Sequence, residues 1–146
     1  HHGGIVGGLP KTCQKVDKPA AGLVLDLKQR GLLDSTIVHW GGEIGRLPVI
    51  QNEANIGRDH NGVGFSMWLA GGGIKRGHIH GATDELAHRA VEDIVHHYDY
   101  HATLFHLFGL DIERVTFNRP NGKSSLTDGQ PGKVVGGILR RPPSVS

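Results

Sequence analysis

Apolar residues recur at helical spacing in two parts of the chain. Ala20, Leu23 and Leu27 follow one another at three- and four-residue intervals, which predicts a helix from Ala20 to Arg30. Gly31 stands where a glycine commonly ends a helix. The preceding residues, 1–19, are rich in Gly and Pro and are predicted to form a loop.

The second helical pattern predicts a helix from Asp99 to Phe108. Ala102, Leu104 and Phe105 give it an apolar face. Asp99 suits the N-cap position, because its carboxylate can accept a hydrogen bond from a free amide of the first turn. Gly109 is placed to end the helix.

Continuous apolar runs predict strands between these helices. Residues 36–40 (TIVHW) and 64–70 (GFSMWLA) are predicted to be buried strands. Residues 74–80 suit a short strand or a turn, and residues 83–95 fit either a helix or an edge strand. The segment VTFNRPNGKSSLTD predicts a hairpin with its turn at residues 120–122. A helix, a short loop and a strand in succession are typical of α/β proteins.

Composition narrows the class of protein further. The 146 residues suffice for one domain or for part of a larger one. The formal net charge is +2 and the charges are interleaved without a basic stripe, so no nucleic-acid partner is expected. No apolar run is long enough to span a bilayer. Cys13 is the single cysteine and is expected to be an unpaired, inert thiol. Because the chain starts without Met, we expect its natural N-terminus to lie further upstream.

Histidines are abundant, 11 of 146 residues, and one region combines them with carboxylates. Glu43 comes soon after the predicted strand 36–40, and ligands of α/β proteins commonly bind beyond the carboxyl ends of strands. Its carboxylate suits a divalent cation, and the alternative is a surface side chain paired with Arg46. Asp59 and His60 follow in a glycine-rich loop. A carboxylate beside an imidazole suits metal binding, and the alternative is a structural histidine.

A second histidine cluster surrounds Asp99. His97 and His101 are four positions apart and would share a helix face, which resembles half of a zinc site without the glutamate of H-E-x-x-H. The alternative is that Asp99 is a plain helix cap and that the histidines border the core. The sequence contains neither a phosphate-loop motif nor a G-x-S-x-G elbow.

Four stretches of the chain together resemble the C-terminal part of the DUF1501 family. They are HHGGIVGGLPKTCQKVD, LDLKQRGLLDSTIVHWGGEIGR, GRDHNGVGFSMWLAGGGIKRG and residues 96–111. The resemblance implies that residues 1–139 form the C-terminal part of one domain, and we expect residues 140–146 to be a disordered tail. DUF1501 proteins are similar to the alkaline phosphatase and sulfatase superfamily. That likeness implies a three-layer α/β/α fold, here with a small C-terminal hairpin, and metal ions at the carboxyl edge of its sheet.

The resemblance also implies roles for individual residues. It assigns His2, Glu43 and His60 to a site for a divalent metal such as zinc, calcium or manganese. Asp59 is assigned there as a further ligand or as a group that orients one. Asp99 and His101 match a family motif and are expected beside the site.

Two departures from the superfamily pattern accompany these assignments. Ile44 stands where the superfamily has a histidine, and an isoleucine cannot bind metal. The superfamily's nucleophile and its first metal-binding Asp are expected before residue 1, in an N-terminal region of the same protein.

Two functions of different classes follow from these assignments. The first is metal-dependent hydrolysis of a sulfate or phosphate ester. Arg46 and Arg58 would bind the anionic group, and the substrate would be a small anionic ester or a sulfated or phosphorylated carbohydrate. The second is a non-catalytic binding or structural role in the cell envelope, which Ile44 favours. A free-standing small zinc protein ranks last, since it leaves the ordered resemblance unexplained. The family resemblance implies a periplasmic or envelope location.

Overall fold

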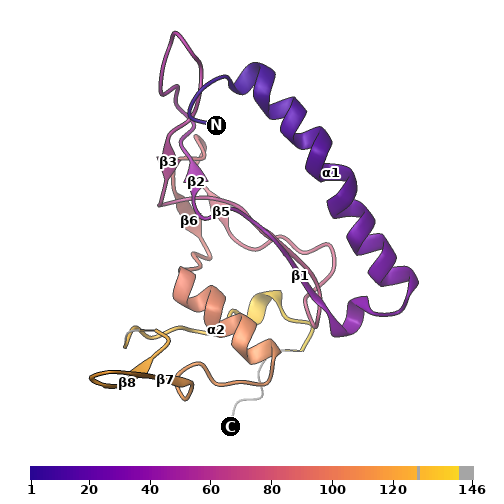
Figure 1. Ribbon diagram of the computed structural model, residues 1–146, viewed down its shortest axis with the longest axis vertical. Helices are drawn as coiled ribbons and strands as arrows, with labels where there is room; N and C mark the ends of the chain where they lie inside the picture. The colour runs from indigo at the N-terminus through magenta and orange to yellow at the C-terminus, as the bar shows by residue number, and fades with distance from the viewer. Residues whose placement is uncertain (128, 142–146) are drawn as a thin grey trace. The chain divides into compact units, whose positions relative to one another are not determined.

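The chain folds into two α-helices and four separate pairs of antiparallel strands within the part that the computed structural model describes, residues 1–127 and 129–141 (Figure 1). It is a mixed α/β structure. The described residues do not form a three-layer α/β/α sandwich, because each strand pair stands alone and no larger sheet joins them. By its contacts the chain divides into two units: unit 1 comprises His1–Gly72 and Gly81–Asp93, and unit 2 comprises Gly73–His80 and Ile94–Ser146.

Unit 1 contains one long helix and three of the strand pairs. β1 pairs with β4, β2 with β3, and β5 with β6, all antiparallel. The bounds are α1 Ile5–Gln29, the 3₁₀ helix η1 Leu33–Ser35, β1 Ile37–Trp40, β2 Gly45–Arg46, β3 His60–Asn61, β4 Trp68–Gly71, β5 Ala82–Thr83 and β6 Ala90–Glu92.

Helix α1 is much longer than predicted, and the expected loop over residues 1–19 is wrong. The helix includes Pro10 and Pro19. A proline inside a helix removes one backbone hydrogen bond and costs about 3 kcal/mol relative to alanine, and the prediction treated that cost as decisive. The start is instead fixed by a tertiary contact, because the Ile5 amide donates to the carbonyl of Ile56 at 2.9 Å. Gly31, at φ 71°, follows the end of the helix as predicted.

The β1–β4 pair confirms the position of the first predicted strand and shortens the second. The predicted burial is wrong, because Val38 is buried in β1 but no residue of β4 is. The predicted strand at residues 64–70 begins only at Trp68. At its end the chain passes close to the η1 turn, where the Gly72 amide donates to the carbonyl of Leu33 at 3.0 Å. A Cβ on Gly71 would overlap that same carbonyl, and its φ of 78° also favours glycine. Glycine is therefore needed where this strand ends.

Residues 83–95, which suited either a helix or an edge strand, contain strands. Thr83 in β5 pairs with Ala90 in β6. The loop between them is closed by Asp84, whose carboxylate accepts the amide of His88 at 2.7 Å. A local side-chain bond of this kind competes with helix formation, which explains why the helical apolar spacing did not prevail.

Unit 2 is built around helix α2, His97–Leu107. Four apolar side chains of this unit are buried: Ile74, Ala102, Ile112 and Leu139. The predicted hairpin is confirmed as β7, Thr116–Arg119, and β8, Gly122–Ser125, with Arg119 opposite Gly122. Where a strand or a turn was predicted at residues 74–80, Ile74 makes a single bridge to Leu139, and the 3₁₀ helix η2, Gly136–Ile138, precedes that partner.

The end of the chain is described only as far as Arg141. The Arg140 amide donates to the carbonyl of Gly73 at 2.8 Å, so the ordered contacts of unit 2 reach residue 140. The remainder of the predicted tail, residues 142–146, lies outside the described residues. Over the part of the chain described, neither helix combines the length and the apolar character needed to cross a membrane.

Candidate functional site

The first residues of the chain lie against the loop between β2 and β3. The Arg58 amide donates to the carbonyl of His1 at 2.9 Å. Two residues earlier in the same loop, the carbonyl of Ile56 accepts the Ile5 amide at 2.9 Å. Gly57 lies directly against the His2 backbone, so close that a Cβ there would overlap the His2 carbonyl. These contacts place the His2 side chain over the loop.

Strands β2 and β3 bring Arg46 and His60 together. The two residues are directly opposite each other in the antiparallel register, and opposite residues project their side chains from the same face. The Leu47 amide continues the pairing by donating to the carbonyl of Asp59 at 2.9 Å. Gly45 lies so close to the carbonyl of Gly64 that a side chain would not fit.

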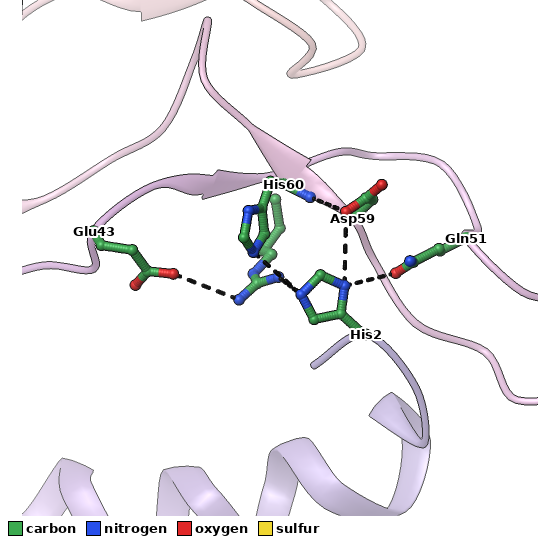
Figure 2. Close-up of polar contacts among 6 residues, drawn as sticks. His2, Glu43, Gln51, Asp59 and His60 are labelled. Atoms are coloured by element: carbon green, nitrogen blue, oxygen red, sulfur yellow. Dashed lines mark hydrogen bonds and ion pairs between the residues drawn. The ribbon is translucent and has the colours of Figure 1, made fainter.

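One nitrogen of the His2 imidazole faces two oxygen acceptors (Figure 2). His2 Nδ1 lies 2.9 Å from Gln51 Oε1 and 3.6 Å from Asp59 Oδ1. Only a protonated nitrogen can donate to these oxygens. The contacts therefore favour the tautomer with the proton on Nδ1, which leaves the lone pair on Nε2.

The other nitrogen of His2 faces nitrogen atoms. His2 Nε2 lies 3.1 Å from Nε2 of His60 and 3.0 Å from a terminal nitrogen of Arg46. A guanidinium nitrogen can only donate, so Arg46 donates to the His2 lone pair. A single ring nitrogen offers one lone pair, and His60 approaches that same atom.

Glu43 and Asp59 contact the edge of this group. The Glu43 carboxylate lies 3.9 Å from Arg46, so it is tied to the guanidinium as the ion-pair alternative predicted. The Asp59 carboxylate also accepts the backbone amide of His60 at 2.8 Å, so it contacts both His2 and His60. The side chains of His2 and Asp59 are 51% and 54% exposed. Exposed ion pairs contribute little to stability, so the His2–Asp59 contact by itself adds little to the stability of the fold.

The distance between the two imidazoles suits a divalent cation, but the described residues do not supply the further ligands that a metal ion needs. Zinc binds imidazole nitrogen at about 2.0–2.1 Å, so two ligands of a tetrahedral zinc lie about 3.3 Å apart, close to the 3.1 Å between His2 and His60. Asp59 and Gln51 contact the opposite nitrogen of His2, as the acceptors that orient a ligating histidine commonly do. Among the described residues, however, no three His, Cys, Asp or Glu side chains are arranged to hold a metal ion.

Three further predicted residues make contacts of their own. The Arg58 guanidinium donates to the backbone carbonyl of Gly57 at 3.0 Å, within unit 1. Asp99 belongs to unit 2, where its two oxygens accept the amides of His96 at 3.0 Å and Lys133 at 2.8 Å. His101, in α2, is exposed and makes an edge contact with the ring of Tyr100 at 5.6 Å between centroids.

Asp99 is not the residue that caps α2. The N-cap is His96, whose side chain accepts the Tyr98 amide at 3.5 Å, and Asp99 occupies the third helical position of a capping box. The helix starts two residues earlier than predicted, because a histidine ring nitrogen serves as the cap acceptor in place of the usual Ser, Thr, Asp or Asn.

Sequence reasoning missed Gln51 and Asn61. Gln51 lies in the middle of the loop and carries no motif that would link it to His2. The Asn61 side chain is 1% exposed, donates to the carbonyl of His88 at 2.8 Å and accepts the amide of Val63 at 3.1 Å. It therefore anchors the strand that carries His60. Its neighbour Gly62 indicated only a turn.

Comparison with known proteins gives one match. The model of a family described as "Protein of unknown function (DUF1501)" matches residues 1–139. No curated protein and no solved structure matches the chain.

Proposed function

This chain belongs to the DUF1501 family, and we propose that it contributes a metal-binding half-site to the hydrolysis of a sulfate or phosphate ester. The resemblance of this family to sulfatases and alkaline phosphatases implies that chemistry. The observation that carries the proposal is the distance of 3.1 Å between Nε2 of His2 and Nε2 of His60. Under the same proposal, the strands of unit 1 belong to a three-layer α/β/α sheet that other parts of the protein complete.

Each side chain of the site has a role in this proposal. His2 and His60 would hold a divalent cation of the class of zinc, manganese or calcium, while Gln51 and Asp59 keep the proton of His2 on Nδ1. Glu43 would be a third ligand, which requires it to leave Arg46. The Arg46 guanidinium, released from Glu43 and from His2 Nε2, would bind an oxygen pair of the ester, a geometry that guanidinium matches. The bound cation would polarise the ester oxygen and stabilise the developing negative charge.

The substrate and the setting follow from the same assignments. A small anionic ester, or a sulfate or phosphate carried on a carbohydrate, offers the charged oxygens that Arg46 and the cation would bind. The nucleophile is supplied by a region of the protein before residue 1. We propose the periplasm or cell envelope as the location of the reaction, which is what the family resemblance implies.

Metal uptake tests the proposal directly. We expect the purified chain to bind zinc or manganese at one site, measured by elemental analysis after equilibrium dialysis. His2→Ala and His60→Ala should each lower the affinity at least tenfold, since each removes a ligand. His88→Ala is the matched control, because it removes an exposed imidazole of the same unit, and the hydrogen bonds of His88 to Asn61 and Asp84 come from its backbone. Equal affinity in all three variants would refute the metal site.

A second function, non-catalytic binding or a structural role in the envelope, is favoured by one observation. Arg46 lies 3.0 Å from His2 Nε2, where it takes the lone pair that a cation would need, and Ile44 stands where a further ligand is expected. In that case the histidine pair fastens the N-terminal segment to the loop. The chain would then take up no metal, and His60→Ala would lower the hydrogen-exchange protection of the Arg58 amide instead.

A further inference from the structure

A hollow in unit 2 is lined by cationic side chains. Its volume is about 500 Å³, and the described residues that line it are Lys75, Arg76, Gly77, His78 and Arg140. The lining contains two guanidinium groups, one ammonium group and an imidazole that becomes positive when protonated. None of the described lining residues is acidic.

Two short segments far apart in the chain build this hollow together. The Lys75 amide donates to the carbonyl of Ile138 at 2.8 Å, and the Arg140 amide donates to the carbonyl of Gly73 at 2.8 Å. Between them Ile74 bridges Leu139, and these two side chains are only 6% and 1% exposed. The backbone that carries the cations is therefore fixed by a buried apolar contact.

Side-chain contacts and charge reinforce the same arrangement. Lys75 Nζ donates to the carbonyl of Gly137 at 2.7 Å across 62 positions of the chain, which holds its ammonium group at the joint between the segments. Unit 2 contains eight Lys and Arg against four Asp and Glu, a formal charge of +4, whereas unit 1 contains eight against ten, a formal charge of −2. Long-range attraction of an anion thus favours the unit that carries the hollow.

We propose that this hollow binds a tetrahedral oxyanion, a phosphate or sulfate group. Guanidinium and ammonium groups donate charge-assisted hydrogen bonds to such oxygens, and the planar guanidinium matches them in pairs. The site needs no metal and is independent of His2 and His60, so it stands or falls separately from the proposed hydrolysis.

The test is titration of the full chain with inorganic phosphate and with inorganic sulfate at constant ionic strength. Binding is measured by calorimetry and by the chemical shifts of the backbone amides. Arg76→Gln and Arg140→Gln remove one charge each from the hollow and leave the backbone bonds in place. Lys123→Gln is the control, because it removes one charge from exposed strand β8 of the same unit. We expect each hollow variant to bind phosphate about tenfold more weakly, and the control to stay within about twofold of the unaltered chain.

Equal weakening by all three variants, or no saturable binding of either ion, would overturn the proposal, since general surface charge would then explain everything. Titration with dextran sulfate separates the two sources of the group. If the site serves a polymer-borne sulfate, Arg76→Gln and Arg140→Gln weaken dextran sulfate binding as strongly as they weaken that of the free ion. If it serves a free oxyanion, Arg76→Gln and Arg140→Gln weaken binding of the free ion and leave the affinity for dextran sulfate unchanged.

Discussion

His2 and His60 face each other through like atoms, Nε2 to Nε2 at 3.1 Å, although 58 positions separate them in the chain. Two ring nitrogens at this distance need either a shared proton or a shared cation between them. The opposite nitrogen of His2 is already committed to Gln51 and Asp59. The tautomer of neutral His2 is therefore set by the oxygen atoms of Gln51 and Asp59 and not by His60.

The first prediction concerns that protonation. In the neutral state His2 should carry its proton on Nδ1, and Gln51→Leu combined with Asp59→Asn should shift the population toward the Nε2–H tautomer, because both acceptors are weakened or lost. Long-range ¹⁵N–¹H correlation spectra of the imidazoles at alkaline pH measure the two forms. The exposed His88 serves as an internal reference whose tautomer should not change. Finding native His2 mainly in the Nε2–H form would contradict the arrangement.

The second prediction concerns the backbone contact that places His2. Gly57→Ala adds a methyl group where the His2 carbonyl lies, so the N-terminal segment must move away from the loop. We expect the Arg58 amide to lose its hydrogen-exchange protection, and under the proposed metal site the affinity for zinc should fall at least tenfold.

Gly22→Ala is the matched substitution for that experiment. Gly22 lies within α1, and a Cβ there meets nothing within 4 Å. Alanine favours a helix interior by roughly 0.5–1 kcal/mol over glycine, so this variant should be neutral or slightly more stable. An equally small effect of Gly57→Ala would mean that His2 is not held by the loop.

The elements that local sequence determines were predictable. The hairpin of β7 and β8 follows from a turn signal between two short runs, and strand β1 follows from a continuous apolar run closed by glycines. Helix α1 was not predictable over its first half, because its start depends on the contact between Ile5 and Ile56, and a contact across 51 positions leaves no trace in local propensity. The three-layer sheet that the resemblance implies is not formed by the described residues and stays a proposal.

The candidate site was predictable in part from the residues and in part from the family resemblance. The carboxylate beside an imidazole pointed to Asp59 and His60, the resemblance added His2, and the fold brings the side chains of His2 and His60 into contact. The opposition of Arg46 and His60 needed the register of β2 and β3, which two-residue strands do not reveal in sequence. Gln51 could not be found, since an amide in a loop gives no signal until its partner is known. Metal binding by Glu43 and Asp59 stays a prediction.

The third prediction is a pH dependence in the loop between β5 and β6. The backbone amide of His88 donates to the Asp84 carboxylate at 2.7 Å, and this hydrogen bond is the main reason that the pKa of Asp84 is below its ordinary value. A carboxyl group with a lowered pKa stabilises the folded loop above about pH 4, and that contribution is lost as the pH falls through the folded-state pKa.

Carboxyl chemical shifts during an acid titration check this prediction. The Asp84 midpoint should lie below about 3.9, the ordinary value of an aspartate, and protection of the His88 amide should fall over the same interval. Asp84→Asn should remove this acid dependence, because the amide side chain does not titrate. A midpoint for Asp84 at or above that ordinary value would contradict the prediction.

The last prediction concerns a buried hydroxyl in unit 2. Thr103 is 1% exposed, donates to the carbonyl of Asp99 at 2.7 Å and accepts the amide of Val135 at 2.9 Å. Thr103→Val keeps the shape and leaves the Val135 amide without this acceptor, which should lower the free energy of unfolding by about 1–3 kcal/mol.

Thr103→Ser separates the hydroxyl from the methyl group. It retains both hydrogen bonds and should cost only about 1 kcal/mol for the lost methyl group. Thr116→Val, on the exposed strand β7, is the matched control and should change stability by less than about 0.5 kcal/mol. Urea unfolding read out by amide exchange at Val135 measures all three variants. If Thr103→Val proved as stable as the control, the hydroxyl would not be the group that fastens the segment around Val135 to α2.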